Sequence, residues 1–160
     1  MKKVVISGMI GNGLEWYDFA IYTYMVTIIS KLFFPEGDEA VHLLSTLAIF
    51  AVGFIFRPVG GIMFGVIGDK VGRRNALVAA IFLMAFPTGC IGLLPTYEQV
   101  GILAPCLLVV LRIMQGLSLG GAFSGSITFL VEHAPANKRG LIGSASIASL
   151  VIGFLLGSLV

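Results

Sequence analysis

Four ionisable side chains lie inside apolar stretches of this sequence and are candidates for moving protons or holding anions. Glu15 and Asp18 are three residues apart, and Arg57 and Arg112 lie within later apolar runs. A carboxyl group in a low dielectric favours its neutral form, so it can exchange a proton near neutral pH. A guanidinium stays protonated and binds carboxylates through parallel hydrogen bonds. The pattern predicts proton coupling and the handling of a polar solute.

The two carboxylates of the first apolar run lie on one side of a predicted helix. Glu15, Asp18 and Tyr22 stand at i, i+3 and i+7, which places them on one face. One interpretation is that this face borders a solute path and that one carboxylate carries the proton. The other is that the helix begins near Trp16 and the carboxylates lie among lipid headgroups beside an aromatic anchor.

The two arginines have different predicted partners. Arg57 lies in the middle of its run, and a buried guanidinium is costly unless it is paired, so we expect Glu15 or Asp18 beside it. That pair either takes part in transport or only holds two helices together. Arg112 and Gln115 lie one turn apart on a later run, where Arg112 would bind an anionic group or lie beside a carboxylate.

Composition assigns the chain to a lipid bilayer. Hydrophobic residues make up 58% of its 160 residues and charged residues only 11%, too few to cover a soluble domain. The net charge is only +2, so we expect no nucleic-acid partner. The apolar runs predict an all-α membrane protein with about five transmembrane helices, at residues 4–34, 41–67, 75–94, 100–131 and 141–160.

Loop charges predict the orientation of these helices. Basic residues gather at the N-terminus and in two alternate loops: Lys2, Lys3, Lys70, Arg73, Arg74, Lys138 and Arg139. Because basic loops stay in the cytoplasm, the N-terminus and both basic loops are predicted to be cytoplasmic. We therefore expect an integral protein of a bacterial cytoplasmic (inner) membrane.

Three segments carry a family resemblance. The loop GVIGDKVGRR, residues 65–74, resembles the G-x-L-(A/S)-D-(R/K)-x-G-R-(R/K) signature of the major facilitator superfamily. GNGLEWYDF, residues 11–19, resembles a motif of its metabolite:proton symporter branch, which includes proline/betaine, alpha-ketoglutarate and shikimate porters. RIMQG, residues 112–116, resembles the superfamily's R-x-x-x-G-x-x-x-G motif in its R-x-x-Q-G form. One departure is Ala122, where that branch has a glutamate.

This resemblance implies twelve helices in two six-helix halves. The 160 residues would then be an incomplete N-terminal half, part of the N-terminal six-helix bundle. The missing C-terminal half would be a partner, in the same chain or in a separate one.

A second motif of the superfamily, E-x-x-P-x-x-x-R-G, is matched by residues 132–140. By resemblance, this motif and the signature loop form a salt-bridged gate at the cytoplasmic mouth, with Asp69, Arg73, Arg74, Glu132 and Arg139 as its residues. The alternative is a solvated cluster that only sets topology, in which each exposed pair is worth about 0 to 1 kcal/mol.

These patterns predict a symporter and not an enzyme. The sequence has no phosphate-binding loop, nucleophile elbow or His/Cys metal spacing, so we expect no catalytic activity, cofactor or metal. The leading hypothesis is proton-coupled symport of a small polar solute, of the proline or betaine type, by alternating access. Its path would be lined by Glu15, Asp18, Tyr22, Arg57, Arg112 and Gln115.

Three aromatic residues support the betaine hypothesis, since Trp16, Tyr17 and Tyr22 would hold a quaternary ammonium by cation–π contact. Two alternatives stay open. The first is an organic-acid symporter, for a dicarboxylate or shikimate-like solute, with Arg57 and Arg112 as anion ligands. The second is a non-functional or split-gene fragment without transport activity of its own.

Overall fold

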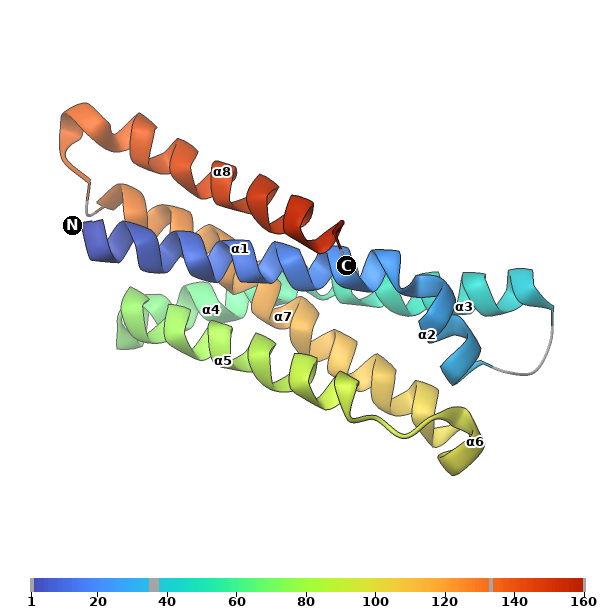
Figure 1. Ribbon diagram of the computed structural model, residues 1–160. Helices are drawn as coiled ribbons and strands as arrows, with labels where there is room; N and C mark the ends of the chain where they lie inside the picture. Colours follow the sequence, from blue (N-terminus) through green and yellow to red (C-terminus); the bar gives the residue numbers. More distant parts are fainter. Residues whose placement is uncertain (1, 35–37, 133, 160) are drawn as a thin grey trace.

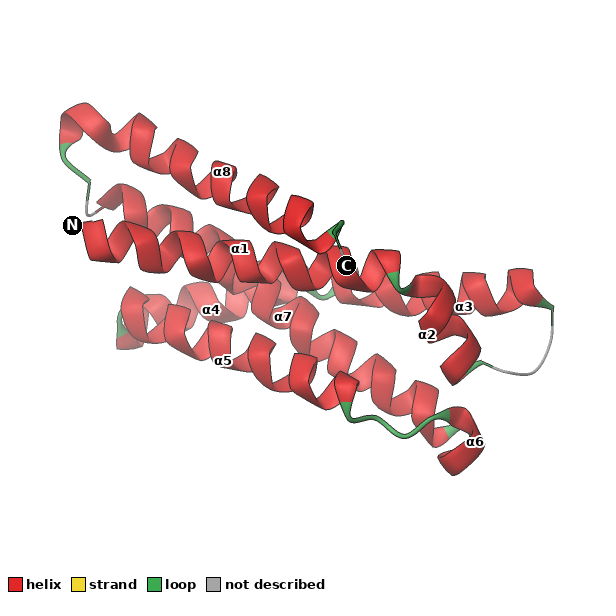
Figure 2. Ribbon diagram, viewed as in Figure 1, coloured by secondary structure: helices red, strands yellow, loops and turns green. Residues whose placement is uncertain are grey.

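The computed structural model describes residues 2–34, 38–132 and 134–159; the side chains of residues 2–5, 7, 39, 122–124, 129, 130, 132 and 136 also lie outside the description. The described backbone is a bundle of long helices without strands (Figure 1; Figure 2). In chain order its elements are α1 (Lys2–Tyr24), α2 (Val26–Phe33), α3 (Glu39–Ile55), α4 (Arg57–Val71), α5 (Arg73–Gly92), α6 (Tyr97–Val100), α7 (Leu103–Glu132), the 3-10 turn η1 (Ala136–Lys138) and α8 (Arg139–Gly157).

Four of the described segments are long and apolar enough to cross a membrane. They are Ala40–Val71, Arg73–Gly92, Leu103–Thr128 and Arg139–Gly157. α1 has 23 residues, enough to cross a hydrocarbon core of about 30 Å, but Glu15 and Asp18 make it less apolar. It packs along α8 and α7, so protein surrounds much of it (Figure 1). The chain is an all-α membrane protein, as its composition predicts.

Two of the apolar runs are each divided into two helices. The run expected at 4–34 changes direction at Met25, between α1 and α2. The run expected at 41–67 breaks at Phe56, because Pro58 lacks a backbone N–H and its ring crowds the preceding turn. The helices α5, α7 and α8 cover most of the other runs, expected at 75–94, 100–131 and 141–160.

Successive long helices run antiparallel, so their loops gather at two ends of the bundle (Figure 1). The N-terminal end of α1 lies at the same end as the α4–α5 junction and the link between α7 and α8. These two connections carry the basic residues Lys70, Arg73, Arg74, Lys138 and Arg139. One end of the bundle is therefore basic, which is the arrangement that the loop charges require.

Gly72 makes the tight reversal between α4 and α5. Its φ is +97°, in a region that only glycine adopts without strain. Its backbone N–H bonds to the Gly68 carbonyl, which closes α4, while α5 begins at the next residue. Gly72 of the signature loop is thus needed for the backbone reversal.

Glycines let the helix backbones approach closely. A Cβ atom on Gly116 of α7 would overlap the carbonyl of Gly53 on α3, and one on Gly153 of α8 would overlap the carbonyl of Gly13 on α1. Close backbone contact of this kind drives helix association in a membrane. Apolar side chains gain little there by leaving lipid for a helix interface, because lipid tails are equally apolar. These contacts fix α7 against α3 and α8 against α1.

Apolar side chains fill two clusters and leave a polar layer between them. The first cluster joins α2, α3 and α7, and the second joins α4 and α5: Phe33, Ile49, Ala104 and Leu108 in the first, Phe64, Ala76 and Ala80 in the second. On α7, Arg112 and Gln115 follow Leu108 and are buried. This polar layer contains candidate functional residues that the sequence predicts.

Candidate functional site: a buried layer of paired charges

Gln115 of α7 is the centre of a hydrogen-bonded cluster that joins three helices. Its Nε2 donates to Asp18 Oδ2 of α1 at 3.0 Å and to Thr88 Oγ1 of α5 at 2.8 Å. Its Oε1 accepts from Arg112 Nη1 at 2.7 Å. The side chain of Gln115 is only 1% exposed. Its two partners of opposite charge fix the orientation of the amide, with oxygen toward the guanidinium and nitrogen toward the carboxylate.

Arg112 is held by an aromatic ring as well as by Gln115. Its Cζ lies 3.5 Å from the centroid of the Tyr22 ring, and its side chain is 5% exposed. The Asp18 carboxylate attracts this guanidinium electrostatically. The Tyr22 hydroxyl in turn donates to the carbonyl of Thr46 at 3.4 Å, which connects the cluster to α3.

Glu15 and Arg57 attract each other electrostatically, about one turn from Asp18 along α1. Glu15 is 2% exposed. Two partners are expected for Arg57 from the sequence, Glu15 and Asp18. In the structure Glu15 is the partner of Arg57, and Asp18 lies beside Arg112. The helix does not begin near Trp16, as one alternative expected, because α1 begins at Lys2.

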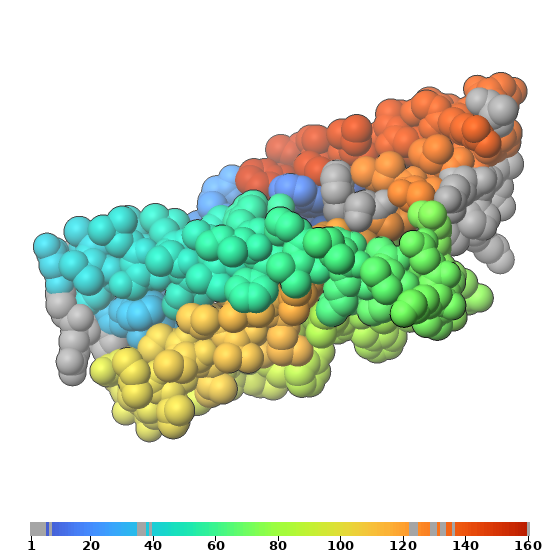
Figure 3. All heavy atoms as spheres, turned by 180° about the vertical axis from the view of Figure 1, so that it is seen from behind, coloured from blue at the N-terminus to red at the C-terminus, as the bar shows by residue number. Residues whose placement is uncertain are grey.

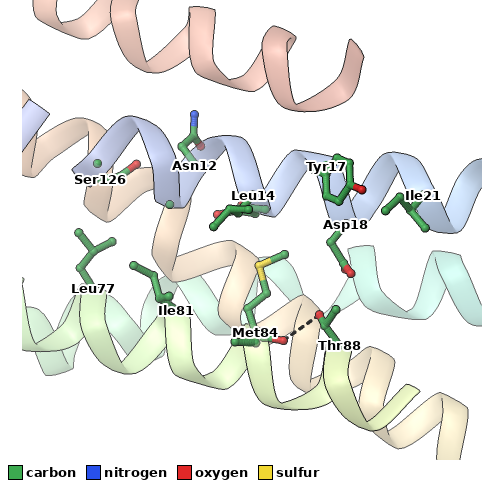
Figure 4. A pocket seen from close by; sticks show the side chains of 14 residues that line it. Asn12, Leu14, Tyr17, Asp18, Ile21, Leu77, Ile81, Met84, Thr88 and Ser126 are labelled. Carbon is green, nitrogen blue, oxygen red and sulfur yellow. Dashed lines mark hydrogen bonds between the residues drawn. The ribbon is translucent and has the colours of Figure 1, made fainter. Parts of the chain in front are cut away.

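A cavity of about 360 Å³ lies beside this layer, between α1 and α5 (Figure 4). Asp18 points from α1 toward Thr88 of α5, and most of the other lining side chains are apolar, among them Leu14, Ile21, Leu77, Ile81 and Met84. Asn12 also borders the cavity, but its amide points toward α8 (Figure 4). There its Nδ2 donates to Ser146 O at 2.6 Å and to Ser149 Oγ at 3.0 Å.

Thr88 and the serine partners of Asn12 are not predicted from the sequence. Thr88 had a signal, since it is the single hydroxyl residue in the run 75–94. The serines had none, because α8 contains several of them and only the packing shows which ones face α1.

The residues of the expected gate lie at the basic end of the bundle. Asp69 and Arg73 border one cavity of about 240 Å³ between α4, α5 and α7. Arg74 and Arg139 are exposed, and the side chain of Glu132 lies outside the described part of the chain. The structure thus brings Asp69 and Arg73, on either side of the Gly72 reversal, to one small cavity.

Buried ionisable groups in a membrane bundle mark the paths of ions and polar solutes, since acyl chains cannot solvate them. A layer with Glu15 and Arg112 buried and Asp18 and Arg57 half-buried is therefore typical of the class of membrane transport proteins. Residues 4–160 match the sugar (and other) transporter family, and the chain belongs to this family of the major facilitator superfamily.

Two curated relatives are similar along nearly the whole chain. The first is the proline/betaine transporter of Escherichia coli (strain K12), 40% identical over 158 residues, which are 99% of this chain and 32% of that protein. The second is the glycine betaine/proline/ectoine/pipecolic acid transporter OusA of Dickeya dadantii (strain 3937), with the same identity and coverage. The chain thus spans about a third of the length of these relatives. No solved structure matches it.

Proposed function

We propose that these residues form part of a transporter that carries a small zwitterionic osmolyte, of the proline or betaine type, together with protons. The names of the two relatives support the substrate class. The observation that carries the coupling mechanism is the Asp18 carboxylate, which is hydrogen-bonded by Gln115 and attracted by Arg112 inside a membrane bundle. The transporter would lie in a bacterial cytoplasmic membrane with its N-terminus in the cytoplasm. The basic end of the bundle supports this orientation.

Asp18 is the proposed proton carrier. When its carboxylate takes up a proton, the attraction to Arg112 ends and Gln115 loses the charge that orients its amide. The link between α1 and α7 then weakens, because it depends on this bridge. A proton would thereby change how two helices of the path are held, which couples its uptake to a conformational change. Protonation of Glu15, about one turn away, would end its attraction to Arg57 in the same way.

Alternating access also needs a closure that opens on the cytoplasmic side. We assign it to Asp69, Arg73, Arg74, Glu132 and Arg139, and the shared cavity of Asp69 and Arg73 supports this assignment. Breaking charged contacts at this end would release α4 and α5 from α7. Such exposed contacts are individually weak, which suits a gate that has to open and close repeatedly.

The test is uptake of radiolabelled glycine betaine and proline by cells that express the full-length transporter, with and without a pH gradient. Asp18→Asn is expected to abolish accumulation driven by the gradient, and Glu15→Gln to reduce it. Glu98→Gln changes an exposed carboxylate of α6 and is expected to behave as wild type. Unchanged proton dependence in both Asp18→Asn and Glu15→Gln would remove α1 from the mechanism.

An organic acid is the second candidate substrate. It is favoured by Arg57, whose Nε and Nη2 are buried and find no hydrogen-bond partner among the described residues. A dicarboxylate would satisfy both. Proton-dependent uptake of alpha-ketoglutarate but not of glycine betaine would establish this candidate. A gene product of only these 160 residues that accumulates neither solute would instead fit a fragment without activity of its own.

A further inference from the structure

The guanidinium of Arg57 lies among aromatic rings from two helices. Its Cζ is 4.1 Å from the centroid of Phe54, 4.8 Å from that of Phe19 and 5.7 Å from that of Trp16. Phe50 packs behind these rings, with its centroid 4.6 Å from that of Phe19. We call Trp16, Phe19 and Phe54 the aromatic cage. Aromatic faces of this kind attract cations by their quadrupoles.

The guanidinium of Arg57 lies in the cage with two of its nitrogen atoms making no hydrogen bond to any described residue. Arg57 Nε and Nη2 are buried, and neither reaches an acceptor in the part of the chain that is described. Buried N–H groups normally have acceptors, and each one left without an acceptor destabilises the folded state. A cation that has no N–H group would lose nothing at this site, so the surroundings suit a quaternary ammonium better than they suit the guanidinium.

The position of the cage supports access from a watery path. Phe54 is 40% exposed and Arg57 is half-buried, so the cage opens at the surface of the bundle. The view from behind shows α3 and α4 in front, with part of α1 visible between α3 and α8 (Figure 3). A half-buried guanidinium at membrane depth has to face protein or water and not acyl chains.

We propose that the aromatic cage is the binding site for the quaternary ammonium of a betaine, and that the substrate enters by displacing the Arg57 guanidinium from it. This proposal rests on the proposed osmolyte transport and replaces Tyr17 and Tyr22, the aromatic partners expected from the sequence, with Phe19 and Phe54. Glu15 supplies the negative charge beside the cage. The displaced guanidinium, next to the bound ammonium, meets the carboxylate of the betaine.

The first experiment measures binding of radiolabelled glycine betaine and of proline to the full-length transporter in nanodiscs. Phe54→Leu and Phe19→Leu are expected to raise the Kd for glycine betaine roughly 5- to 30-fold. The Kd for proline, whose ammonium carries N–H groups, is expected to change far less, which also shows that the variants fold. Phe82→Leu, on an exposed part of α5, is the matched control. Equal losses for both solutes would overturn the cage.

The second experiment tests displacement with ligands that separate charge from shape. Tetramethylammonium is expected to compete with glycine betaine. 3,3-Dimethylbutanoate, which keeps the shape and carboxylate of glycine betaine but has a carbon in place of the ammonium nitrogen, is not. Arg57→Gln is expected to lower the inhibition constant of tetramethylammonium several-fold, because the competing guanidinium is gone, while glycine betaine gains no affinity. An unchanged or higher constant for tetramethylammonium would contradict the displacement.

A third experiment uses tryptophan fluorescence to test the cage independently of the proposed osmolyte transport. Trp16 is the single tryptophan of these 160 residues. Tetramethylammonium is expected to change a fluorescence signal that is lost in Trp16→Phe. If this change occurs but neither glycine betaine nor proline binds, the osmolyte function fails and the cage stands. If wild type and Trp16→Phe respond alike, the cage fails, whatever the transporter carries.

Discussion

Asp18 accepts a 3.0 Å hydrogen bond from Gln115, a residue 97 positions later in the chain. The same amide accepts a hydrogen bond from Arg112, so a neutral side chain connects a carboxylate with a guanidinium. This bridge keeps the two charges associated without a direct ion pair. It is a link that protonation of a single group is able to alter.

Replacing Gln115 is expected to disrupt the polar layer more than it disrupts the bundle. Gln115→Ala removes the bridge and leaves the buried Arg112 guanidinium without this acceptor, which costs about 1 to 3 kcal/mol. Thr88 keeps its hydrogen bond to the Met84 carbonyl. We expect accumulation of solute to fall at least tenfold and the melting temperature in detergent to drop. The control is Gln99→Ala, at an exposed position of α6. Wild-type accumulation by Gln115→Ala would show that the bridge has no part in transport.

The close approach of α7 and α3 gives a prediction about stability. A Cβ atom at Gly116 would overlap the Gly53 backbone, so Gly116→Ala has to separate the two helices. We expect a loss of about 1 to 3 kcal/mol in unfolding free energy, measured by thermal denaturation in nanodiscs.

Gly89→Ala is the matched control for this glycine. Its Cβ would meet no described atom within 4 Å, and the residue lies inside α5. Alanine has the better helix propensity, so this variant should be at least as stable as wild type. Equal melting temperatures for the two glycine variants would mean that α7 and α3 are not held by this contact.

Asn12 is expected to hold α8 against α1. Its Nδ2 donates two hydrogen bonds to Ser146 and Ser149, 134 and 137 positions away. Asn12→Ala removes both, and interhelical hydrogen bonds of this kind are worth about 0.6 to 2 kcal/mol in membranes. Faster proteolysis of the link between α7 and α8 would report the loosening. Asn137→Ala, at an exposed position in that link, should leave the rate unchanged.

The orientation of the bundle is testable with single cysteines introduced at its two opposite ends. The chain contains two cysteines, both free thiols, Cys90 and Cys106, which are first replaced by serine. In intact cells, a membrane-impermeant maleimide should label Glu98→Cys but label Lys138→Cys only after permeabilisation. The reverse pattern would place the basic end outside and contradict the assignment of a cytoplasmic gate.

Much of the fold follows from local features of the sequence. Apolar runs of membrane length predict the helices, and Pro58 and Gly72 explain a break and a reversal through their own backbone properties. The bend at Met25 carries no such local signal. The superfamily was recognisable from short motifs, since their spacing is a property of the chain and not of its packing.

The sequence by itself determined the membrane class, the basic end of the bundle and which ionisable residues lie inside apolar runs, because the free-energy cost of a residue in lipid depends on its type and on its neighbours along the chain. Only the tertiary structure decided that Glu15 faces Arg57 while Asp18 reaches Gln115 and Arg112. It also decided that Thr88 joins them and that phenylalanines surround Arg57. Those contacts depend on how helices rotate and pack against one another, and side chains spaced one turn apart on α1 can face either arginine until that packing is fixed.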